Sequence, residues 1–243
     1  MSESEYEEAT KVEIVTHFDS YATEYERALA KNLRVIPGGT DYYFWNRVSK
    51  LSECWGAGAE PETILDFGGG IGLAIPFLTS FFPQSEITIT DESIQSLEVA
   101  ASRHPFVKVL PPEKLPTASF DVAFVAGVLH HVAPPERVHV LRRLIRSVKP
   151  GGLIIFFELN PVNPVTRRLV RMCPFDDNAV LMKMRDVQDL CESEAEIVVE
   201  RSEYMVFFPP IFKPLLRLER LLRRCPLGAQ YFVSARRQIP RNE

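Results

Sequence analysis

Residues 62–157 alternate between short apolar runs and stretches whose apolar positions recur at helical spacing. Short apolar runs bounded by turn residues predict buried strands, and these lie at 64–65, 86–90, 107–110, 122–126 and 153–157. A helix is predicted over 135–148, with Val138, Leu141, Ile145 and Val148 on one stripe. Alternating strands and helices predict an α/β fold with a doubly wound, Rossmann-like and mostly parallel sheet, in which ligands bind at the carboxyl ends of the strands.

The chain after residue 160 follows a different pattern. A helical stretch covers about 160–192, and strand-like runs follow at 195–199 with 205–208, and at 229–235. Between them, residues 215–224 predict a basic amphipathic helix whose stripe is Leu215, Leu218 and Leu222, with four arginines off it. Such a helix can bind a membrane surface, but packing against the sheet is the interpretation we favour, because amphipathic helices are common in soluble domains.

Glycines cluster where the first predicted strand ends. Asp66 closes the strand, and Gly68, Gly69, Gly70 and Gly72 follow before a helix-like stretch. The spacing does not match the Gly-x-Gly-x-x-Gly of dinucleotide-binding proteins, and no P-loop is present. The pattern that remains, Asp66-x-Gly68-x-Gly70-x-Gly72, resembles motif I of the class I S-adenosylmethionine (SAM) methyltransferases. The resemblance implies that this loop packs against the methionine part of SAM; the alternative is a glycine-rich turn in another α/β protein.

Acidic residues follow the second predicted strand. Asp91 lies nineteen positions after Gly72, and Glu92 and Ser93 come next. An acid at this spacing can accept hydrogen bonds from both hydroxyls of a ribose. Ser93 is expected to cap the following helix. The alternative for Asp91 and Glu92 is a helix N-terminus that favours negative charge.

The middle of the chain carries the same resemblance. Residues 115–132, from Leu115-Pro116 to Val128-Leu129-His130-His131-Val132, look like the central part of SAM methyltransferases from small-molecule pathways. The resemblance implies that Ala126 and Gly127 lie beside the cofactor. The acid that binds adenine in the family would fall near Pro111, which has no polar side chain, so Glu113 or a backbone group is expected instead. The late strand runs fit the antiparallel hairpin that closes the seven-stranded sheet of this family.

Two segments are expected to select the methyl acceptor. Phe18, Tyr21 and Tyr25 share one face of a predicted helix, which in similar methyltransferases is a lid over SAM and the acceptor; it could also simply pack on the sheet. Aromatic residues at 42–45 and the Asn-Pro steps at 160–164 are further candidates. The chain is therefore expected to be one domain over 1–243, with a lid and acceptor region at 1–60, the SAM-binding core at 61–160, and acceptor-side and closing elements at 161–243.

Candidate bases lie after the fourth and fifth strands. Histidine has an ordinary pKa of about 6.5 and can take a proton from an acceptor hydroxyl. His130 and His131 are both candidates, and resemblance to quinone-type O-methyltransferases favours His131, with Glu158 as the second choice. Either histidine could instead cap the helix or pack in the core.

Composition narrows the class of protein. A net charge of −4 and a pI near 5.8 argue against a nucleic-acid substrate, which favours a basic face. Cys54, Cys173, Cys191 and Cys225 lack metal-site spacing and are expected to be reduced thiols of a cytoplasmic protein without a metal. No signal peptide and no membrane span are predicted, while peripheral membrane contact stays open.

Taken together, the residues predict a SAM-dependent methyltransferase that modifies a small-molecule, lipid-linked or glycan-linked acceptor, at oxygen. It is similar to methyltransferases of bacterial glycan, lipid or secondary-metabolite pathways. Two alternatives are a non-catalytic SAM-fold binding protein and a nicotinamide-dependent oxidoreductase, which the glycine spacing opposes. The acceptor and the oligomeric state are not determined by the sequence.

Overall fold

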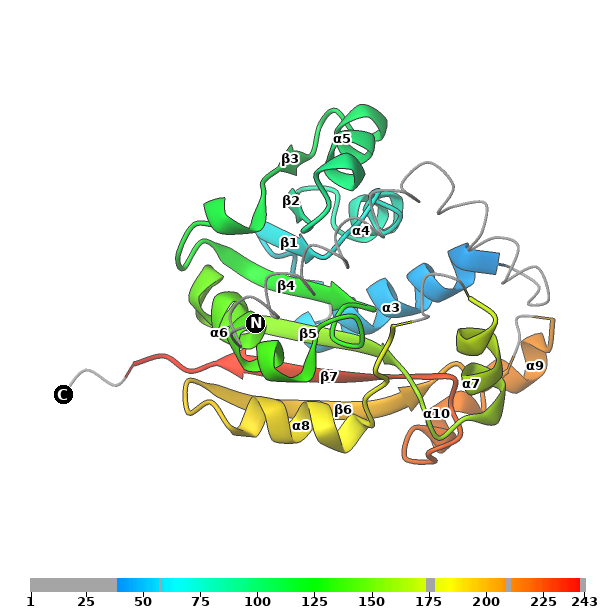
Figure 1. The fold of residues 1–243 in the computed structure, drawn as a ribbon. Helices are drawn as coiled ribbons and strands as arrows, with labels where there is room; N and C mark the ends of the chain where they lie inside the picture. The colour runs from blue at the N-terminus through cyan, green and yellow to red at the C-terminus, as the bar shows by residue number, and fades with distance from the viewer. Residues whose placement is uncertain (1–38, 57, 174–177, 209–210, 241–243) are drawn as a thin grey trace.

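The computed structural model describes residues 39–240, apart from 57, 174–177 and 209–210. The described strands form one seven-stranded sheet in the order β3-β2-β1-β4-β5-β7-β6 (Figure 1). Their bounds are β1 Thr63–Phe67, β2 Glu86–Thr90, β3 Lys108–Val109, β4 Phe120–Ala126, β5 Val148–Leu159, β6 Ile197–Met205 and β7 Gln230–Arg237. Neighbours from β3 to β5 pair in parallel, whereas β7 pairs antiparallel with both β5 and β6. The predicted sheet with its antiparallel closing strands is confirmed.

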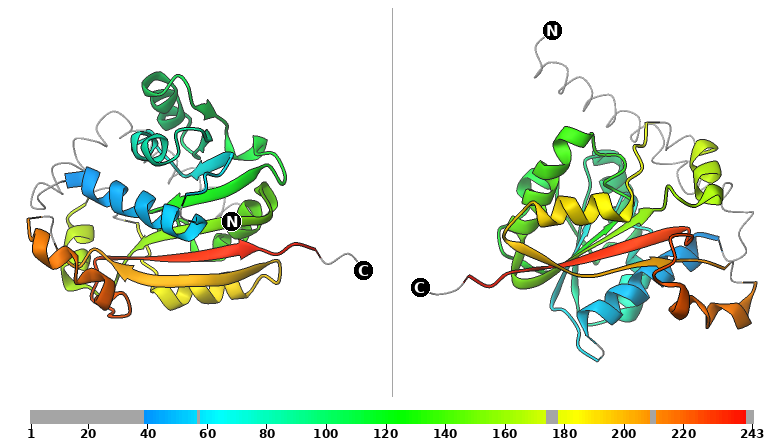
Figure 2. Two further views of the ribbon diagram at one scale, coloured as in Figure 1. Left: turned by 180° about the vertical axis from the view of Figure 1, so that it is seen from behind. Right: turned by 90° about the horizontal axis from the view of Figure 1, so that it is seen from below.

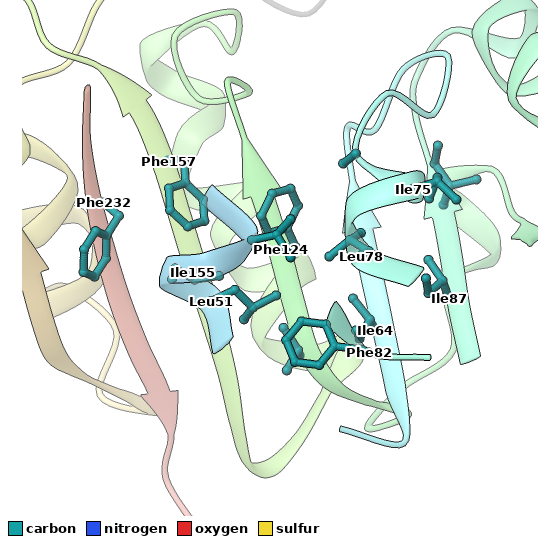
Figure 3. Packing of buried hydrophobic residues seen from close by; sticks show 14 of the residues in the cluster. Leu51, Ile64, Ile75, Leu78, Phe82, Ile87, Phe124, Ile155, Phe157 and Phe232 are labelled. Carbon is teal, nitrogen blue, oxygen red and sulfur yellow. The ribbon is translucent and has the colours of Figure 1, made fainter. Parts of the chain in front are cut away.

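Helices cover both faces of the sheet, as a doubly wound fold requires. On one face α3 (Gly39–Trp55), α4 (Ile75–Phe81) and α5 (Ile94–Arg103) contribute to a single apolar cluster, part of which is shown in Figure 3. On the other face α6 (Arg137–Ser147) and α8 (Met184–Glu192) pack on the alternate residues of the same strands. Because β4 and β5 are covered on both sides, their apolar residues run on without polar alternation.

The remaining helices lie at the end of the sheet where the parallel strands have their carboxyl ends. They are α7 (Pro164–Arg171), α9 (Lys213–Leu216) and α10 (Glu219–Leu222). Figures 1 and 2 show α9 and α10 as neighbours, with α7 at the same end of the sheet but on the other side of β7 in the right view of Figure 2. Two short 3-10 turns at Pro112–Lys114 and Pro134–Glu136 precede β4 and α6.

Several predicted boundaries were wrong. The helix expected over 135–148 begins at Arg137, because a 3-10 turn occupies the residues before it, and ends at Ser147, because Val148 already pairs in β5. The helical stretch of 160–192 is two separate helices, α7 and α8. The runs at 195–199 and 205–208 contribute residues 197–199 and 205 to one strand, since β6 continues between them through polar residues that an edge strand with one exposed face can accept, while 206–208 lie beyond its end.

The amphipathic helix expected over 215–224 was also wrong. The structure has two single-turn helices there, and Leu215 and Leu218 are exposed rather than packed on the sheet. One tertiary contact fixes this arrangement, because Glu219 Oε1 accepts hydrogen bonds from the backbone N–H groups of Phe207 and Phe208 at 2.9 and 3.1 Å. No helix in the described part of the chain is long and apolar enough to cross a membrane.

Candidate active site

Two cavities of about 190 Å³ each lie at the carboxyl ends of β1 and β4. They share part of their lining, which consists of Gly68, Gly70, Ile71, Ala126, Gly127 and His131. The first cavity extends toward α3 and α7, and the second extends toward the start of α5. The glycine loop is therefore a common floor beneath two compartments, at the sheet edge where the sequence predicts ligand binding.

Backbone hydrogen bonds hold the glycine loop in place. The N–H groups of Gly68 and Gly69 donate to Thr90 O at 2.8 and 3.1 Å, and Gly70 N–H donates to Asp91 Oδ2 at 2.9 Å. Gly68, Gly70 and Gly72 have positive φ angles, which glycine adopts without steric cost. The end of β2 thus fixes the path of the loop after β1.

The four glycines are needed for different reasons. A Cβ at Gly69 would lie 2.6 Å from Asp66 Oδ2, one at Gly72 would lie 2.7 Å from the His104 ring, and one at Gly68 would lie 2.5 Å from Val128. A Cβ at Gly70 would meet no atom of the described residues within 4 Å. Gly70 is therefore the position at which the backbone is exposed to the cavities, while the others permit packing of the loop itself.

Asp91 is held rigidly in the second cavity. Its Oδ2 accepts from Gly70 N–H, and its Oδ1 accepts from Ser93 N–H at 2.9 Å. Ser93 in turn caps α5 by accepting from Ser96 N–H, as predicted. A carboxylate can accept about four hydrogen bonds, so these two backbone contacts orient Asp91 for a ligand with hydroxyl groups.

Asp66 is a buried acid in the lining of the first cavity. Its side chain is 2% exposed, and Oδ2 has no hydrogen-bond partner. Burial raises the pKa of Asp66 to about 7, with a further increase from Asp91 and an opposing effect from Arg47. An unpartnered carboxyl of this kind favours a cationic ligand group, which would stabilise its ionised form.

Two polar residues at the cavities were missed by the sequence analysis. Arg47 on α3 is buried in the first cavity, where its Nε donates to Gln230 Oε1 at 3.1 Å and its guanidinium lies 5.4 Å from the ring centre of Phe44. Thr90 lines the second cavity with a buried Oγ1 that has no partner. The signal for Arg47 was a cation two positions after the aromatic residues 42–45, which the pattern analysis did not use.

The histidine pair has two distinct environments. His130 is buried, and its Nδ1 lies 2.5 Å from Glu158 Oε2. The other oxygen of Glu158 accepts from the backbone N–H groups of Val128 and Leu129 at 3.2 and 2.8 Å. His131 is partly exposed, lines both cavities, and lies with its ring centre 4.1 Å from that of His130. Glu158 therefore contacts the loop that carries His131 and is not part of the lining of either cavity.

The other candidate residues are spread more widely. Glu92 lines the second cavity and pairs with Arg143 at 2.9 Å. Glu113 is exposed on the 3-10 turn and does not line the cavities, whereas its neighbour Pro112 does. Gly72 is buried beneath the loop. Tyr21, with the rest of the predicted lid, lies outside the described residues.

Side chains from helices build the acceptor-facing wall of the first cavity. Tyr43 and Phe44 come from α3, and the apolar residues from β5, α7 and the segment after it are Leu159, Leu169, Val170 and Cys173. The predicted aromatic cluster thus contributes both to the core and to the cavity. Asn160 and Asn163 have a different role, because their side-chain amides donate to backbone carbonyls of residues 226–228 and tie α7 to that loop.

Comparison with known proteins shows related sequences. Residues 65–154 match the family described as "Methyltransferase domain". A malonyl-[acyl-carrier protein] O-methyltransferase of Halalkalibacterium halodurans is 34% identical over 113 residues, which are 42% of this chain and 41% of that protein. Methyltransferase str3 of Strobilurus tenacellus is 29% identical, over 42% of this chain and 36% of that protein. The chain thus matches less than half the length of these curated relatives.

Solved structures share the fold over most of the described chain. A SAM-dependent methyltransferase from Thermotoga maritima has a TM-score of 0.61 at 19% identity and covers 93% of this chain and 100% of its own. Phosphoethanolamine N-methyltransferase 2 of Haemonchus contortus, solved with SAM, has a TM-score of 0.60 at 18% identity, over 92% of this chain and 60% of its own. The methyltransferase-domain match begins one residue before Asp66 and ends within β5, so it spans the glycine loop and the strands around it. The chain is therefore similar over these residues to the methyltransferase-domain family, and it shares its fold with solved SAM-dependent methyltransferases.

Proposed function

We propose that this protein transfers a methyl group from SAM to a hydroxyl group of an acceptor with an apolar body. The observation that carries the proposal is the position of His131, which lines both the cavity beside Asp91 and the apolar cavity beside α3 and α7. A base at this junction can reach an acceptor hydroxyl next to the cofactor. Two curated relatives are named as O-methyltransferases, which supports oxygen as the methylated atom.

The chemistry of the cavities fits SAM as the cofactor. Asp66 would pair with the ammonium of its methionine part, because the buried carboxyl has an unpartnered oxygen. Arg47 would pair with the methionine carboxylate in the same cavity. Asp91 would accept hydrogen bonds from the ribose hydroxyls, and Gly70, whose Cβ position is open, would let the cofactor approach the backbone.

Adenine would lie in the second cavity against apolar side chains. Pro112, Val132 and Val140 line this compartment, with Ser96 as a polar neighbour. We do not expect Glu113 to bind adenine, because its side chain is not part of the lining of this cavity. We therefore propose that stacking and backbone contacts, rather than an acidic side chain, hold the base.

Catalysis would need little from the protein beyond orientation and proton transfer. When bound, SAM supplies a methyl group activated by the sulfonium. His131 would accept the proton of the acceptor hydroxyl as it attacks. Glu158 and His130 would be positioning residues, because the carboxylate bonds both His130 and the backbone before His131.

The acceptor compartment favours an apolar molecule. Most of its wall is made of aliphatic and aromatic side chains, and its polar members include the buried Arg47, Thr166 and Gln230. A sugar or a polyphosphate would leave hydroxyl or phosphate groups without partners there, at a cost of about 1–3 kcal/mol for each buried group. Phenols, hydroxyquinones and polyketide or lipid alcohols fit this wall better.

Two measurements test the proposal in sequence. Calorimetry with SAM and with NADH comes first, and we expect saturable binding of SAM alone. A screen with methyl-labelled SAM follows, comparing hydroxylated apolar acceptors with their amine analogues and with sugars. Transfer to the hydroxylated compounds supports the proposal. Binding of SAM without transfer to any class would favour the non-catalytic alternative, and binding of NADH would overturn the assignment of the cofactor.

A further inference from the structure

Exposed apolar side chains gather at the sheet end that carries α7, α9 and α10. Leu221 is 80% exposed, Ile211 66%, and Val165 and Met172 61% each. The leucines of α9 and α10 were expected to pack against the sheet, yet Leu215 and Leu218 also lie on the surface. We call the exposed side chains of residues 164–172 and 211–227, Lys213 left aside, the arginine–leucine surface. Exposed apolar side chains that gather at one end of a folded protein can mark an interaction site.

The same surface has a charge opposite to that of the whole chain. Residues 164–172 and 211–227 hold eight of the 28 lysines and arginines, but one of the 32 acidic residues, which is Glu219. The arginines at 167, 168, 171, 217, 220, 223 and 224 are exposed. Glu219 is the single acid in these two segments, and its carboxylate accepts hydrogen bonds from the backbone of residues 207 and 208. The remainder of the chain has 20 lysines and arginines against 31 acidic residues, so this end has a net positive charge while the rest of the chain has a net negative one.

Hydrogen bonds join the parts of this surface into one unit. Asn163 Nδ2, at the start of α7, donates to Leu227 O at 2.6 Å. Asn160 Nδ2 donates to Pro226 O and Gly228 O at 3.0 and 2.7 Å. Tyr204 N–H donates to Arg223 O at 2.8 Å, which ties the end of α10 to β6. The helices α7, α9 and α10 lie at the same end of the sheet in Figures 1 and 2, and the right view of Figure 2 shows α7 on one side of β7 and α9 and α10 on the other.

We propose that the arginine–leucine surface binds a bilayer that contains anionic lipid. Arginines beside exposed aliphatic residues match both layers of the bilayer surface. The arginines bind the anionic headgroups, and the apolar side chains enter the boundary of the acyl chains. A nucleic acid would use the arginines but not the leucines. A second copy in a symmetric contact would bring the arginines of one protomer against those of the other.

The placement of α7 gives this surface a consequence for the acceptor. One side of the helix is exposed at Val165 and Arg168, while Thr166, Leu169 and Val170 line the first cavity. A protein docked through this surface would hold the cavity next to the bilayer. If the proposed methyl transfer is correct, on which this step rests, the acceptor is carried in the membrane as a lipid or a lipid-linked molecule.

Vesicle sedimentation tests the docking without any reference to catalysis. The full chain is mixed with vesicles of phosphatidylcholine alone or with phosphatidylglycerol added. We expect binding to the anionic vesicles that weakens as salt is raised. Because each arginine near an anionic surface contributes about 1 kcal/mol, Arg220→Gln with Arg224→Gln should weaken binding by about 30-fold. Leu218→Ser with Leu221→Ser should also release the protein.

Matched controls separate this proposal from its alternatives. Arg146→Gln with Phe106→Ser changes one exposed arginine and one exposed apolar residue outside the surface, and it should bind vesicles normally. All variants should bind SAM as the wild type does, so a failure of docking is distinct from a failure of the proposed function. Absence of binding to anionic vesicles overturns the proposal. Equal binding of all variants to the vesicles also overturns it. The same holds if the wild type is a dimer that the leucine variant dissociates, or if duplex nucleic acid displaces the protein from the vesicles.

Discussion

The two cavities have the same floor but differently built walls. The compartment beside Asp91 is made largely by strand ends, where backbone N–H groups fix the carboxylate. The compartment beside α7 is made by side chains of helices that flank the sheet, with Arg47 as its buried cation. In the compartment beside Asp91 the main chain sets the geometry. In the compartment beside α7 the side chains set it, so a single substitution can change the shape of the wall.

This difference agrees with the extent of the sequence match. The methyltransferase-domain match of residues 65–154 includes the glycine loop, Asp91 and both histidines, but ends before α7 and begins after α3. A cofactor common to a family requires the same backbone approach in each member, while acceptors differ. The compartment that is built from α3 and α7 is accordingly where this protein's own specificity is expected to lie.

The largest expected effect concerns the junction between the compartments. His131→Ala should lower kcat by about 10²–10⁴, because proton transfer from the acceptor hydroxyl is lost, and should leave SAM affinity nearly unchanged. The wild-type rate should fall in acid, since only a neutral imidazole accepts a proton. The measurement is kcat with an acceptor found in the screen, beside calorimetry with SAM.

Glu158→Gln provides the companion variant. Its amide oxygen can still accept from the backbone of Val128 and Leu129, but the charge that faces His130 is gone. A positioning role predicts a smaller loss of kcat than in His131→Ala. Near-normal kcat in His131→Ala would remove this residue from the role of base and would favour an acceptor that does not need one.

The next effect is on SAM affinity and concerns Asp91 in the second cavity. Asp91→Ala should weaken SAM binding by about 2–3 kcal/mol, because charge-assisted hydrogen bonds at a partly buried site are lost. Part of this loss arises from the loop, since Asp91 also accepts from Gly70 N–H. Asp91→Asn keeps one acceptor oxygen and should lose less. A change below about 0.5 kcal/mol by calorimetry would make Asp91 only a helix-end acid.

Substitutions in the glycine loop separate an effect on SAM affinity from an effect on the stability of the fold. Gly70→Ala places its Cβ in open space, so it should bind SAM about 1–3 kcal/mol more weakly through overpacking against the cofactor, with a stability cost of about 1–2 kcal/mol for the positive φ. Gly68→Ala would also meet Val128 at 2.5 Å and should lose more stability. Thermal unfolding and SAM titration of both variants measure this, and normal SAM affinity in Gly70→Ala would contradict the assignment of the loop.

The sequence predicted the parts of the site that the backbone forms better than the parts that distant side chains form. Strands β1, β2, β4 and β5, the glycine loop and the Ser93 cap were predicted because local patterns determine them. Arg47 was missed because its burial depends on α3 packing beside β7, where it bonds Gln230, a contact 183 residues distant in the chain. The broken helix at 213–222 was mispredicted because a tertiary bond to Glu219, and not hydrophobic periodicity, decides its ends.

A separate prediction concerns the pH dependence of Asp66, which lines the first cavity. In the folded protein burial raises its pKa to about 7, from 3.8 in the absence of such surroundings. The folded state therefore keeps this proton while the unfolded chain releases it, so the stability that this group contributes is complete below about pH 4 and is lost as pH rises toward 7. Asp66→Asn, which cannot ionise, should remove that slope from cofactor-free unfolding curves.

Binding of SAM should show the opposite trend, because a cationic ligand group favours ionised Asp66. At pH 6 most of the cofactor-free protein carries the proton, and binding must release it, so affinity should be about tenfold weaker at pH 6 than at pH 8. Calorimetry in two buffers of different ionisation enthalpy would detect the released proton near pH 6 directly. If SAM affinity is the same at both pH values in the wild type, and no proton is released, then Asp66 does not contact the cation and serves only to pack the floor beneath Gly69.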